Sequence, residues 1–236
     1  MKSMVERMTT HKRVASVAVC QGEGIKNAFK EVGVDMIVDG NQTMNPSSED
    51  FVDCFNRMDA DNIIVLPNNS NIIMAAEQAK ELYEKENPNV NIVVIKTKSV
   101  SQGFIAANMF VFDDEPIDKI EKDIYASIED VTSIEITTAT RNTTVSGVKV
   151  TKDHYIGIMN HSLKEDNKDK VECLINTIKD DETKESKENI LVIYGKDATK
   201  EDKVKLEEAL KNEFPSLDLS EVDGGQDVYD FNVAIF

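Results

Sequence analysis

Val38-Asp39-Gly40-Asn41-Gln42 is matched near the C-terminus by Val222-Asp223-Gly224-Gly225-Gln226. Each stretch closes a similar segment of chain: an apolar run, a glycine, a helix-like pattern and a second short apolar run. A repeated unit of strand, helix and strand predicts two lobes built on related halves. Coincidence is the alternative interpretation, because Asp-Gly is a common turn dipeptide.

The first part of the chain alternates short apolar runs with helical patterns. Residues 14–19 form a nearly continuous apolar run, as expected of a buried parallel strand. Residues 62–66 and 91–95 read as further strands, and Pro46-Ser47 marks the start of an intervening helix. This alternation predicts an α/β lobe, a parallel sheet covered by helices, over residues 14–112. Residues 1–13 are expected to be a polar tail or helix.

The pattern changes after residue 112. A helix is predicted over residues 117–128, where isoleucines recur at spacings of three and four. Three β-rich stretches at 134–140, 143–150 and 155–159 then predict an antiparallel meander, with Gly147 marking a break. The second lobe, residues 113–236, is therefore expected to be α+β.

The C-terminal part of this lobe contains the second copy of the repeat, as a strand-helix-strand unit. Val204, Leu210 and Phe214 are predicted to form the buried side of its helix, and residues 233–236 a terminal strand. The highly charged stretches at 164–170 and 180–189 read as solvated loops.

Composition limits the classes of function. The net charge of −17 disfavours nucleic acid and charge-driven membrane binding. No apolar run reaches the length of a membrane-spanning helix, and the N-terminus lacks the apolar segment of a secretory signal. Three scattered cysteines indicate a reducing cytoplasm, and three histidines without ligand spacing make a metal site improbable.

Polar side chains follow the predicted strands of the first lobe. Loops after parallel strands share one edge of the sheet, where ligands usually bind, although Asn, Ser and Thr there also cap helices and stabilise turns. Arg141 is an attractive anion partner, or else a solvated arginine at a hairpin turn. The candidate residues for binding a ligand or a partner are Gln42, Thr43, Asn45, Asn68, Asn69, Asn71, Thr97, Gln102, Arg141 and Gln226.

Catalytic machinery is not evident in the sequence. Gly22-Glu23-Gly24 follows a strand and opens a helix, but position 27 is asparagine, so the dinucleotide fingerprint lacks its third glycine. Cys20 ends a strand, yet a buried inert thiol is the favoured interpretation. No pairing of a nucleophile with a base stands out.

Four stretches carry a more specific signal. They are residues 17–24 (Val-Ala-Val-Cys-Gln-Gly-Glu-Gly), 40–47 (Gly-Asn-Gln-Thr-Met-Asn-Pro-Ser), 66–76 (Leu-Pro-Asn-Asn-Ser-Asn-Ile-Ile-Met-Ala-Ala) and 224–226 (Gly-Gly-Gln). Together they resemble the C-terminal domain of the large subunit of bacterial fatty acid kinase. That large subunit is a dihydroxyacetone kinase-like protein. Asn41 and Cys20 depart from the family pattern, which has glycine and a small residue there, and Asn41 puts the backbone of its loop in doubt.

The resemblance implies a DegV-like fold and a non-catalytic role. The domain would dock a DegV-type fatty-acid-binding subunit, so that the bound fatty acid is phosphorylated by an ATP-binding domain outside this chain. ATP and magnesium would bind there, this chain would need no cofactor, and the complex would work as a dimer. The resemblance does not assign docking residues.

Two other functions remain open. The chain could be a stand-alone module that binds a small molecule or acyl chain in the cleft between lobes, with a carboxylate held near Thr43, Asn68 or Arg141. An independent enzyme, such as a phosphatase, is disfavoured because nucleophile and metal ligands are not apparent.

Overall fold

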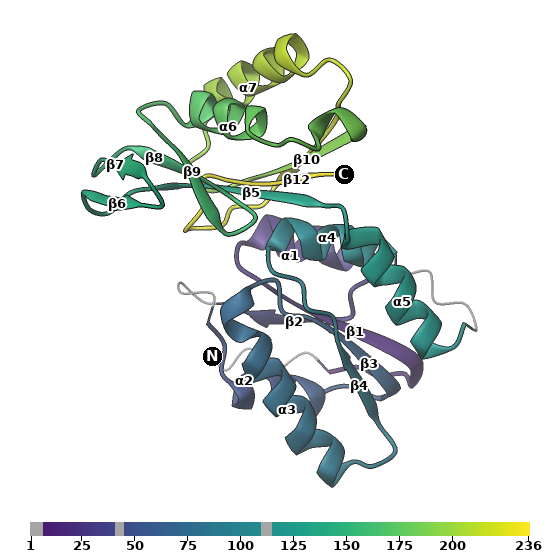
Figure 1. Cartoon of the computed structure of the whole chain (residues 1–236). Helices are drawn as coiled ribbons and strands as arrows, with labels where there is room; N and C mark the ends of the chain where they lie inside the picture. The colour runs from purple at the N-terminus through teal and green to yellow at the C-terminus, as the bar shows by residue number, and fades with distance from the viewer. Residues whose placement is uncertain (1–6, 41–44, 110–114) are drawn as a thin grey trace. The chain divides into compact units, whose positions relative to one another are not determined.

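The computed structural model describes residues 7–40, 45–109 and 115–236. Their contacts define two units, which Figure 1 draws in sequence colours. The first consists of the chain up to Gln21 together with Lys26–Glu129, and the second of Gly22–Ile25 with Asp130–Phe236. Each unit has its own hydrophobic core. The predicted fold, an α/β lobe with a parallel sheet followed by an α+β lobe, is confirmed.

The first unit contains a four-stranded parallel sheet with the strand order β2-β1-β3-β4. The strands are β1 (Lys12–Cys20), β2 (Met36–Asp39), β3 (Ala60–Leu66) and β4 (Asn91–Val94). Strand β1 is buried from Val14 onward, which explains its apolar run. Because all four strands run in one direction, the loops that follow them lie at one edge of the sheet.

Helices cover both faces of this sheet (Figure 1). On one face, α2 (Ser48–Phe55) and α3 (Ile73–Glu86) supply aromatic and small side chains to the core. On the other lie α1 (Glu23–Glu31) and α4 (Val100–Asn108), whose Phe29 and Phe104 rings meet edge to face. Helix α2 begins at a capping box formed by Ser47 and Asp50, as the Pro46-Ser47 pair predicts.

The boundary between the units differs from the one predicted at residue 112. Helix α5 (Ile117–Ile128) belongs to the first unit, and its buried isoleucine stripe packs beside α4. The Tyr125 hydroxyl accepts a hydrogen bond from the Lys96 N–H, just after β4 (3.2 Å). The change of sequence pattern thus precedes the change of unit, because α5 folds back onto the first lobe.

The second unit contains a six-stranded mixed sheet with the order β11-β10-β12-β5-β8-β9. The strands are β5 (Thr132–Thr138), β8 (Tyr155–Met159), β9 (Ser162–Asn167), β10 (Asn189–Tyr194), β11 (Asp218–Asp223) and β12 (Phe231–Ile235). Only the β10–β11 pair among them is parallel. Helices α6 (Lys170–Lys179) and α7 (Lys200–Glu213) pack on one face of the sheet.

A separate hairpin connects β5 to β8. It consists of β6 (Thr143–Val145) and β7 (Val148–Val150), joined by Ser146 and Gly147 with φ of 51° and 86°. Positive φ at both central residues identifies a type I′ turn, which suits the twist of the strands. Gly147 therefore marks a turn between two strands rather than a break within one.

The strand-helix-strand repeat is confirmed at the level of local structure. In both β1-α1-β2 and β10-α7-β11, the two strands pair in parallel. The glycine of each Asp-Gly pair donates a hydrogen bond to the last residue of the first strand: Gly40 to the Cys20 carbonyl and Gly224 to the Tyr194 carbonyl (both 3.0 Å).

The aspartate of each Asp-Gly pair also makes the same contact in both copies. Each pairs with the fourth residue of its helix, Asp39 with Lys26 (2.7 Å) and Asp223 with Lys203. The repeat thus extends from the order of elements to single ion pairs.

Three details of the predicted second lobe are wrong. The stretch at 164–170 is mostly strand β9, and Lys170 is buried against Asp230 (2.7 Å). The stretch at 180–189 contains a buried ion pair, Asp181 with Lys187 (3.4 Å). Val204 is 56% exposed. In the first two cases the charged residues can be buried because each has a partner of opposite charge, Asp230 for Lys170 and Lys187 for Asp181.

Candidate functional site

Two of the predicted site residues meet at the carboxyl edge of the parallel sheet. Asn68 follows β3 and Thr97 follows β4. The Asn68 N–H donates to the Thr97 hydroxyl (3.0 Å), and that hydroxyl donates to the Asn68 side-chain oxygen (2.8 Å). The Asn68 amide group then donates to the Val19 carbonyl of β1 (2.9 Å). One asparagine therefore joins the loops after β3 and β4 to the end of β1.

This network is closed rather than open to a ligand. Asn68 is 2% exposed and Thr97 is fully buried. Asn68 has a φ of 61°, a conformation that asparagine tolerates better than most residues. Gly103 lies against it, and a Cβ at that position would come within 1.7 Å of the Asn68 side-chain oxygen. Asn68 and Thr97 are thus structural residues, since their side-chain polar groups bind each other and the backbone.

The neighbouring candidates divide into helix caps and exposed residues. Asn69 accepts a hydrogen bond from the Asn71 N–H (2.9 Å) and caps the short helix η1 (Ser70–Ile72). The Gln102 side chain accepts one from the Lys98 N–H (2.8 Å). Asn45 and Asn71 are exposed at this edge of the sheet. Gln42 and Thr43 lie outside the described residues.

The glycines at Gly22 and Gly24 serve close packing. A Cβ on Gly24 would lie 1.6 Å from the Asp223 carbonyl oxygen, and one on Gly22 would lie 2.4 Å from the Gly224 carbonyl oxygen. The Ile25 N–H donates to that same Gly224 oxygen (3.1 Å). The space that a phosphate would need in front of a glycine turn is thus filled by backbone, so this turn does not fit a nucleotide.

Gln226, from the second copy of the repeat, is buried beside this turn. Its side-chain amide donates to the Ile193 carbonyl (3.0 Å). Its side-chain oxygen is buried and has no hydrogen-bond partner within the described residues. The residue therefore anchors the Gly-Gly-Gln segment to β10.

Reactive side chains are held in unreactive settings. The cysteines are buried thiols, and burial raises the pKa of Cys54 to about 11 and also raises the pKa of Cys173. A thiol needs a lowered pKa to act as a nucleophile near neutral pH. His154 is partly buried and pairs with Asp166 (2.7 Å). Asp166 also accepts a hydrogen bond from the Thr151 N–H (2.8 Å), so the pair fastens the end of β7 to β9.

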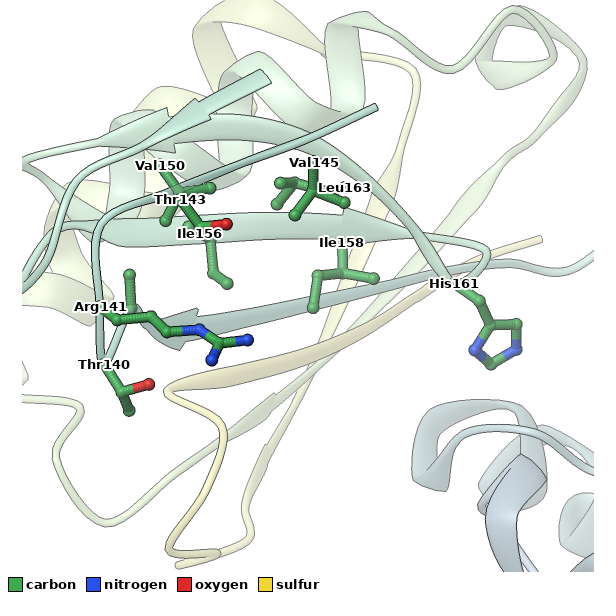
Figure 2. Close-up of a pocket in the computed structure, with 10 residues that line it drawn as sticks. Thr140, Arg141, Thr143, Val145, Val150, Ile156, Ile158, His161 and Leu163 are labelled. Atoms are coloured by element: carbon green, nitrogen blue, oxygen red, sulfur yellow. The ribbon is translucent and has the colours of Figure 1, made fainter. Parts of the chain in front are cut away.

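A pocket in the second unit contains Arg141 (Figure 2). Its volume is ≈ 340 Å³. It lies between the β6–β7 hairpin and the strands β8 and β9. Aliphatic side chains form most of its lining, with Arg141 and the Thr140 hydroxyl at one end in Figure 2 and His161 at the other. The lining residues are Ala139, Thr140, Arg141, Thr143, Val145, Val150, Ile156, Ile158, His161 and Leu163.

Of this lining, sequence reasoning identified Arg141 alone. The alternation of Ile156 and Ile158 signals one apolar face of a strand, but it does not reveal that the hairpin folds over that face. Next to the pocket, Glu135 pairs in register with Ile158. Burial of the Glu135 carboxyl raises its pKa to about 7.

Among residues 7–40, 45–109 and 115–236, no group of three or more His, Cys, Asp or Glu side chains is arranged to hold a metal ion. No described helix has both the length and the apolar composition needed to cross a bilayer.

Comparison with protein families and known sequences gives consistent matches. The model of the FakA-like C-terminal family, which describes the C-terminal part of fatty acid kinase proteins, matches residues 15–235. Protein YloV of Bacillus subtilis (strain 168) is 33% identical over 221 residues, and an uncharacterized protein of Staphylococcus aureus (strain USA300) is 32% identical over 218 residues. Each match spans 92% of this chain but only 38% of the relative's length.

Solved structures with the same fold are much less similar in sequence. The fatty acid kinase (Fak) B3 protein of Streptococcus pneumoniae, loaded with linoleic acid, aligns over 97% of this chain and 99% of its own, with a TM-score of 0.60 and 10% identity. A DegV family protein from Corynebacterium glutamicum aligns over 95% and 97%, with a TM-score of 0.64 and 12% identity. The dihydroxyacetone kinase from C. freundii aligns over 95% of this chain and 48% of its own, with a TM-score of 0.61 and 12% identity. The fold is DegV-like.

Proposed function

The chain belongs to the FakA-like C-terminal family of fatty acid kinase proteins, and from this membership we propose that it is a non-catalytic domain that docks a DegV-type fatty-acid-binding protein. The docked protein would present its fatty acid to an ATP-binding domain that is not part of this chain. The observation that carries the proposal is the family match over residues 15–235.

The lengths of the relatives support a role as one part of a larger protein. The chain spans 38% of the curated relatives that it matches. Phosphoryl transfer depends on bound nucleotide and Mg²⁺, and the glycine turn at Gly22–Gly24 is filled by the backbone of Asp223 and Gly224. We assign ATP and Mg²⁺ to the separate domain.

The proposed partner follows from the shared family and fold. One structural neighbour is itself a fatty acid kinase B3 protein loaded with a fatty acid. A kinase and the carrier of its substrate must meet, and this domain is the part of the kinase that we propose makes the contact. We also propose a cytoplasmic location and a dimeric complex; the buried cysteine thiols fit a reducing compartment.

Calorimetric titration with the DegV-type protein of the same organism tests the proposal. We expect saturable one-to-one binding without ATP. Repeating the titration with the carrier loaded and unloaded shows whether docking depends on the fatty acid. Absence of binding at high concentration of both proteins contradicts a docking role for this domain.

A matched pair of variants locates the docking surface. Leu82 on α3 and Val204 on α7 are 58% and 56% exposed, so a glutamate at either position leaves the core intact. Leu82→Glu and Val204→Glu add the same charge to the outer helices of different units. The unit that carries the docking surface is the one whose variant weakens binding.

An assay of phosphoryl transfer tests the non-catalytic part. This chain, mixed with ATP, Mg²⁺ and loaded carrier, is expected to form no acyl phosphate, whereas we expect the full-length relative with the same carrier to form it. Formation of acyl phosphate by this chain alone overturns that part of the proposal without touching the docking part.

A further inference from the structure

We propose that the outer face of α2 and α3, in the first unit, is an interaction surface for a basic partner, one whose apolar contact residues are flanked by lysine or arginine. Under the docking function proposed above, on which this assignment rests, the partner is the DegV-type protein. The family match and the shared fold assign neither the surface nor its charge.

Apolar side chains are exposed along one side of α3. Met74 and Leu82 are 72% and 58% exposed, the largest values for large apolar side chains among the described residues. They lie eight positions apart with Gln78 midway between them, so the three residues form a stripe along the helix. A partner that covers this stripe removes aliphatic surface from water.

Helix α2 completes this face. It lies beside α3 on the same side of the parallel sheet (Figure 1). The Ser48 hydroxyl donates a hydrogen bond to the Gln78 side-chain oxygen (3.1 Å), and the Tyr83 hydroxyl donates one to the Phe55 carbonyl (3.2 Å). The two helices are thereby joined both at the stripe and beneath it. A preformed surface binds without the cost of ordering its elements.

The same two helices carry negative charge that the fold does not compensate. They contain seven carboxylates and two lysines. The carboxylates are Glu49, Asp50, Asp53, Glu77, Glu81, Glu84 and Glu86, and the lysines are Lys80 and Lys85. Across the parts of the chain that the structure describes, none of these nine side chains forms an ion pair.

The helix pair of the second unit differs in this respect. Helices α6 and α7 contain six acidic and six basic residues. Some of them pair with one another, as Lys179 does with Glu213 (3.0 Å). Of the two helix pairs, α2–α3 is therefore the one that attracts a basic partner.

Two exposed asparagines extend the face at the edge of the sheet. Asn45 precedes α2, and Asn71 lies in η1, directly before α3. Their amide groups can both donate and accept hydrogen bonds. The face thus includes two of the residues that the sequence identifies as candidates for binding a partner.

The arrangement matches the anatomy of a protein interface, in which apolar contacts lie within a polar rim. Asp53 on α2 and Glu81 on α3 are exposed charges of this rim, and Met74 and Leu82 are the apolar contacts. Opposite charges on the partner would speed the encounter and fix its orientation, while the covered apolar side chains would slow dissociation.

Binding kinetics of the full chain on immobilised DegV-type protein test the charge. We expect the association rate to fall as salt is raised, because salt screens exposed charges. The double variant Asp53→Asn, Glu81→Gln is expected to associate about three- to tenfold more slowly and with a weaker dependence on salt. The control Glu207→Gln, Glu208→Gln removes the same charge from exposed positions on α7 and is expected to change both by less than about twofold.

Substitutions at Leu82 separate the apolar contact from the charge. Leu82→Glu and Leu82→Lys both remove the apolar contact, but the lysine also repels a basic partner. We expect Leu82→Lys to weaken binding at least several-fold more than Leu82→Glu. The same two substitutions at Val204, 56% exposed on α7, are the control and are expected to differ by less than about twofold. Circular dichroism verifies that each variant is folded.

The outcomes distinguish this surface from the docking function itself. Absence of binding by the parent chain contradicts docking and the surface together. Full binding by both the double variant and Leu82→Lys leaves docking intact and overturns the surface. A greater loss from Leu82→Glu than from Leu82→Lys shows that the partner is acidic there. If Leu82→Lys binds the DegV-type protein normally but abolishes self-association in sedimentation velocity, the face belongs to a second copy of this chain.

Discussion

Single contacts decide the role of the polar residues that follow the strands of the first unit. Asn68 carries the side chain expected of a ligand contact, but its amide is committed to Val19 and Thr97. The same holds for the glycines near position 24, whose pattern suggests a phosphate loop and whose surroundings are backbone. The type of a residue therefore suggests its role, but the groups that it contacts in the fold determine that role.

Gly24→Ala tests the packing role of the glycine turn. A Cβ there would lie 1.6 Å from the Asp223 carbonyl oxygen, so backbone must shift and we expect a loss of about 1–3 kcal/mol in the free energy of unfolding. Chemical denaturation measures it. Gly33→Ala is the control, because Gly33 has a φ of 98° but nothing near a new Cβ, so only its backbone conformation costs stability, about 1–2 kcal/mol. Equal losses in the two variants would show that Gly24 is not in close contact.

Glu135 should make stability depend on pH. Its pKa is raised from 4.5 to about 7 by burial, so the folded protein holds this proton more tightly than the unfolded chain. The resulting stabilisation is complete below about pH 4.5 and is lost as the pH rises through about 7. Glu135→Gln mimics the neutral acid, and we expect it to be more stable than the parent at about pH 8 and similar at about pH 5.

Denaturation at both pH values measures this difference. Glu208→Gln, at an exposed position on α7, removes the same charge and serves as the control. A similar gain in both variants at high pH would assign the effect to the net charge of −17 rather than to the Glu135 environment.

Secondary-structure elements with continuous apolar runs are predictable from the sequence, and those defined by pairing are not. Strand β1 is recognisable because it is buried on both faces. Strand β9, with the sequence Ser-Leu-Lys-Glu-Asp-Asn, has the composition of a loop and is a strand only because it pairs with β8. Edge strands often carry charge, which removes the alternation on which prediction depends.

The β6–β7 hairpin offers a stabilising substitution. Ser146 occupies a position with φ of 51° next to Gly147, and Asn-Gly is the preferred pair for this turn. We expect Ser146→Asn to raise the free energy of unfolding by about 0.5 kcal/mol, measured by thermal and chemical denaturation. Ser186→Asn, at an exposed site outside this turn, should not reproduce the gain. A loss of stability at Ser146→Asn would contradict the type I′ assignment.

At the scale of the whole molecule, the sequence indicates an α/β lobe, an α+β lobe and a repeat, but not the boundary between the lobes. The repeat is confirmed down to single contacts, because each copy contains the equivalent ion pair, Lys26–Asp39 in one and Lys203–Asp223 in the other. The boundary moves to residue 130 because α5 packs on the first unit. Asn68 and Thr97, which follow β3 and β4, do meet at one edge of the sheet, as predicted. Whether they are accessible to a ligand there depends on side-chain packing, which the spacing of residues in the sequence does not predict. The pocket with Arg141 depends on a hairpin folding over a sheet, which is equally non-local.

Two separate cores predict two levels of protection in hydrogen exchange. Leu206 is fully buried in the second core, and we expect Leu206→Ala to cost about 2–5 kcal/mol there. Amides of β10 and β12 should then exchange faster, while those of β1 and β3 keep their protection. Phe51→Ala, in the first core, should give the reverse pattern. Equal loss in both units from either variant would mean that they unfold as one.

The edge strands of the six-stranded sheet affect how readily copies of this protein aggregate at high concentration. Its two outermost strands are β11 and β9, and both are rich in charged side chains: Asp218, Glu221 and Asp223 on one, Lys164, Glu165 and Asp166 on the other. An extended segment that approached either edge would meet those charges before it could join the ladder of backbone hydrogen bonds. The sheet is thereby a poor template for fibril growth, and a partner that binds this unit must do so through side-chain surfaces rather than by adding a strand.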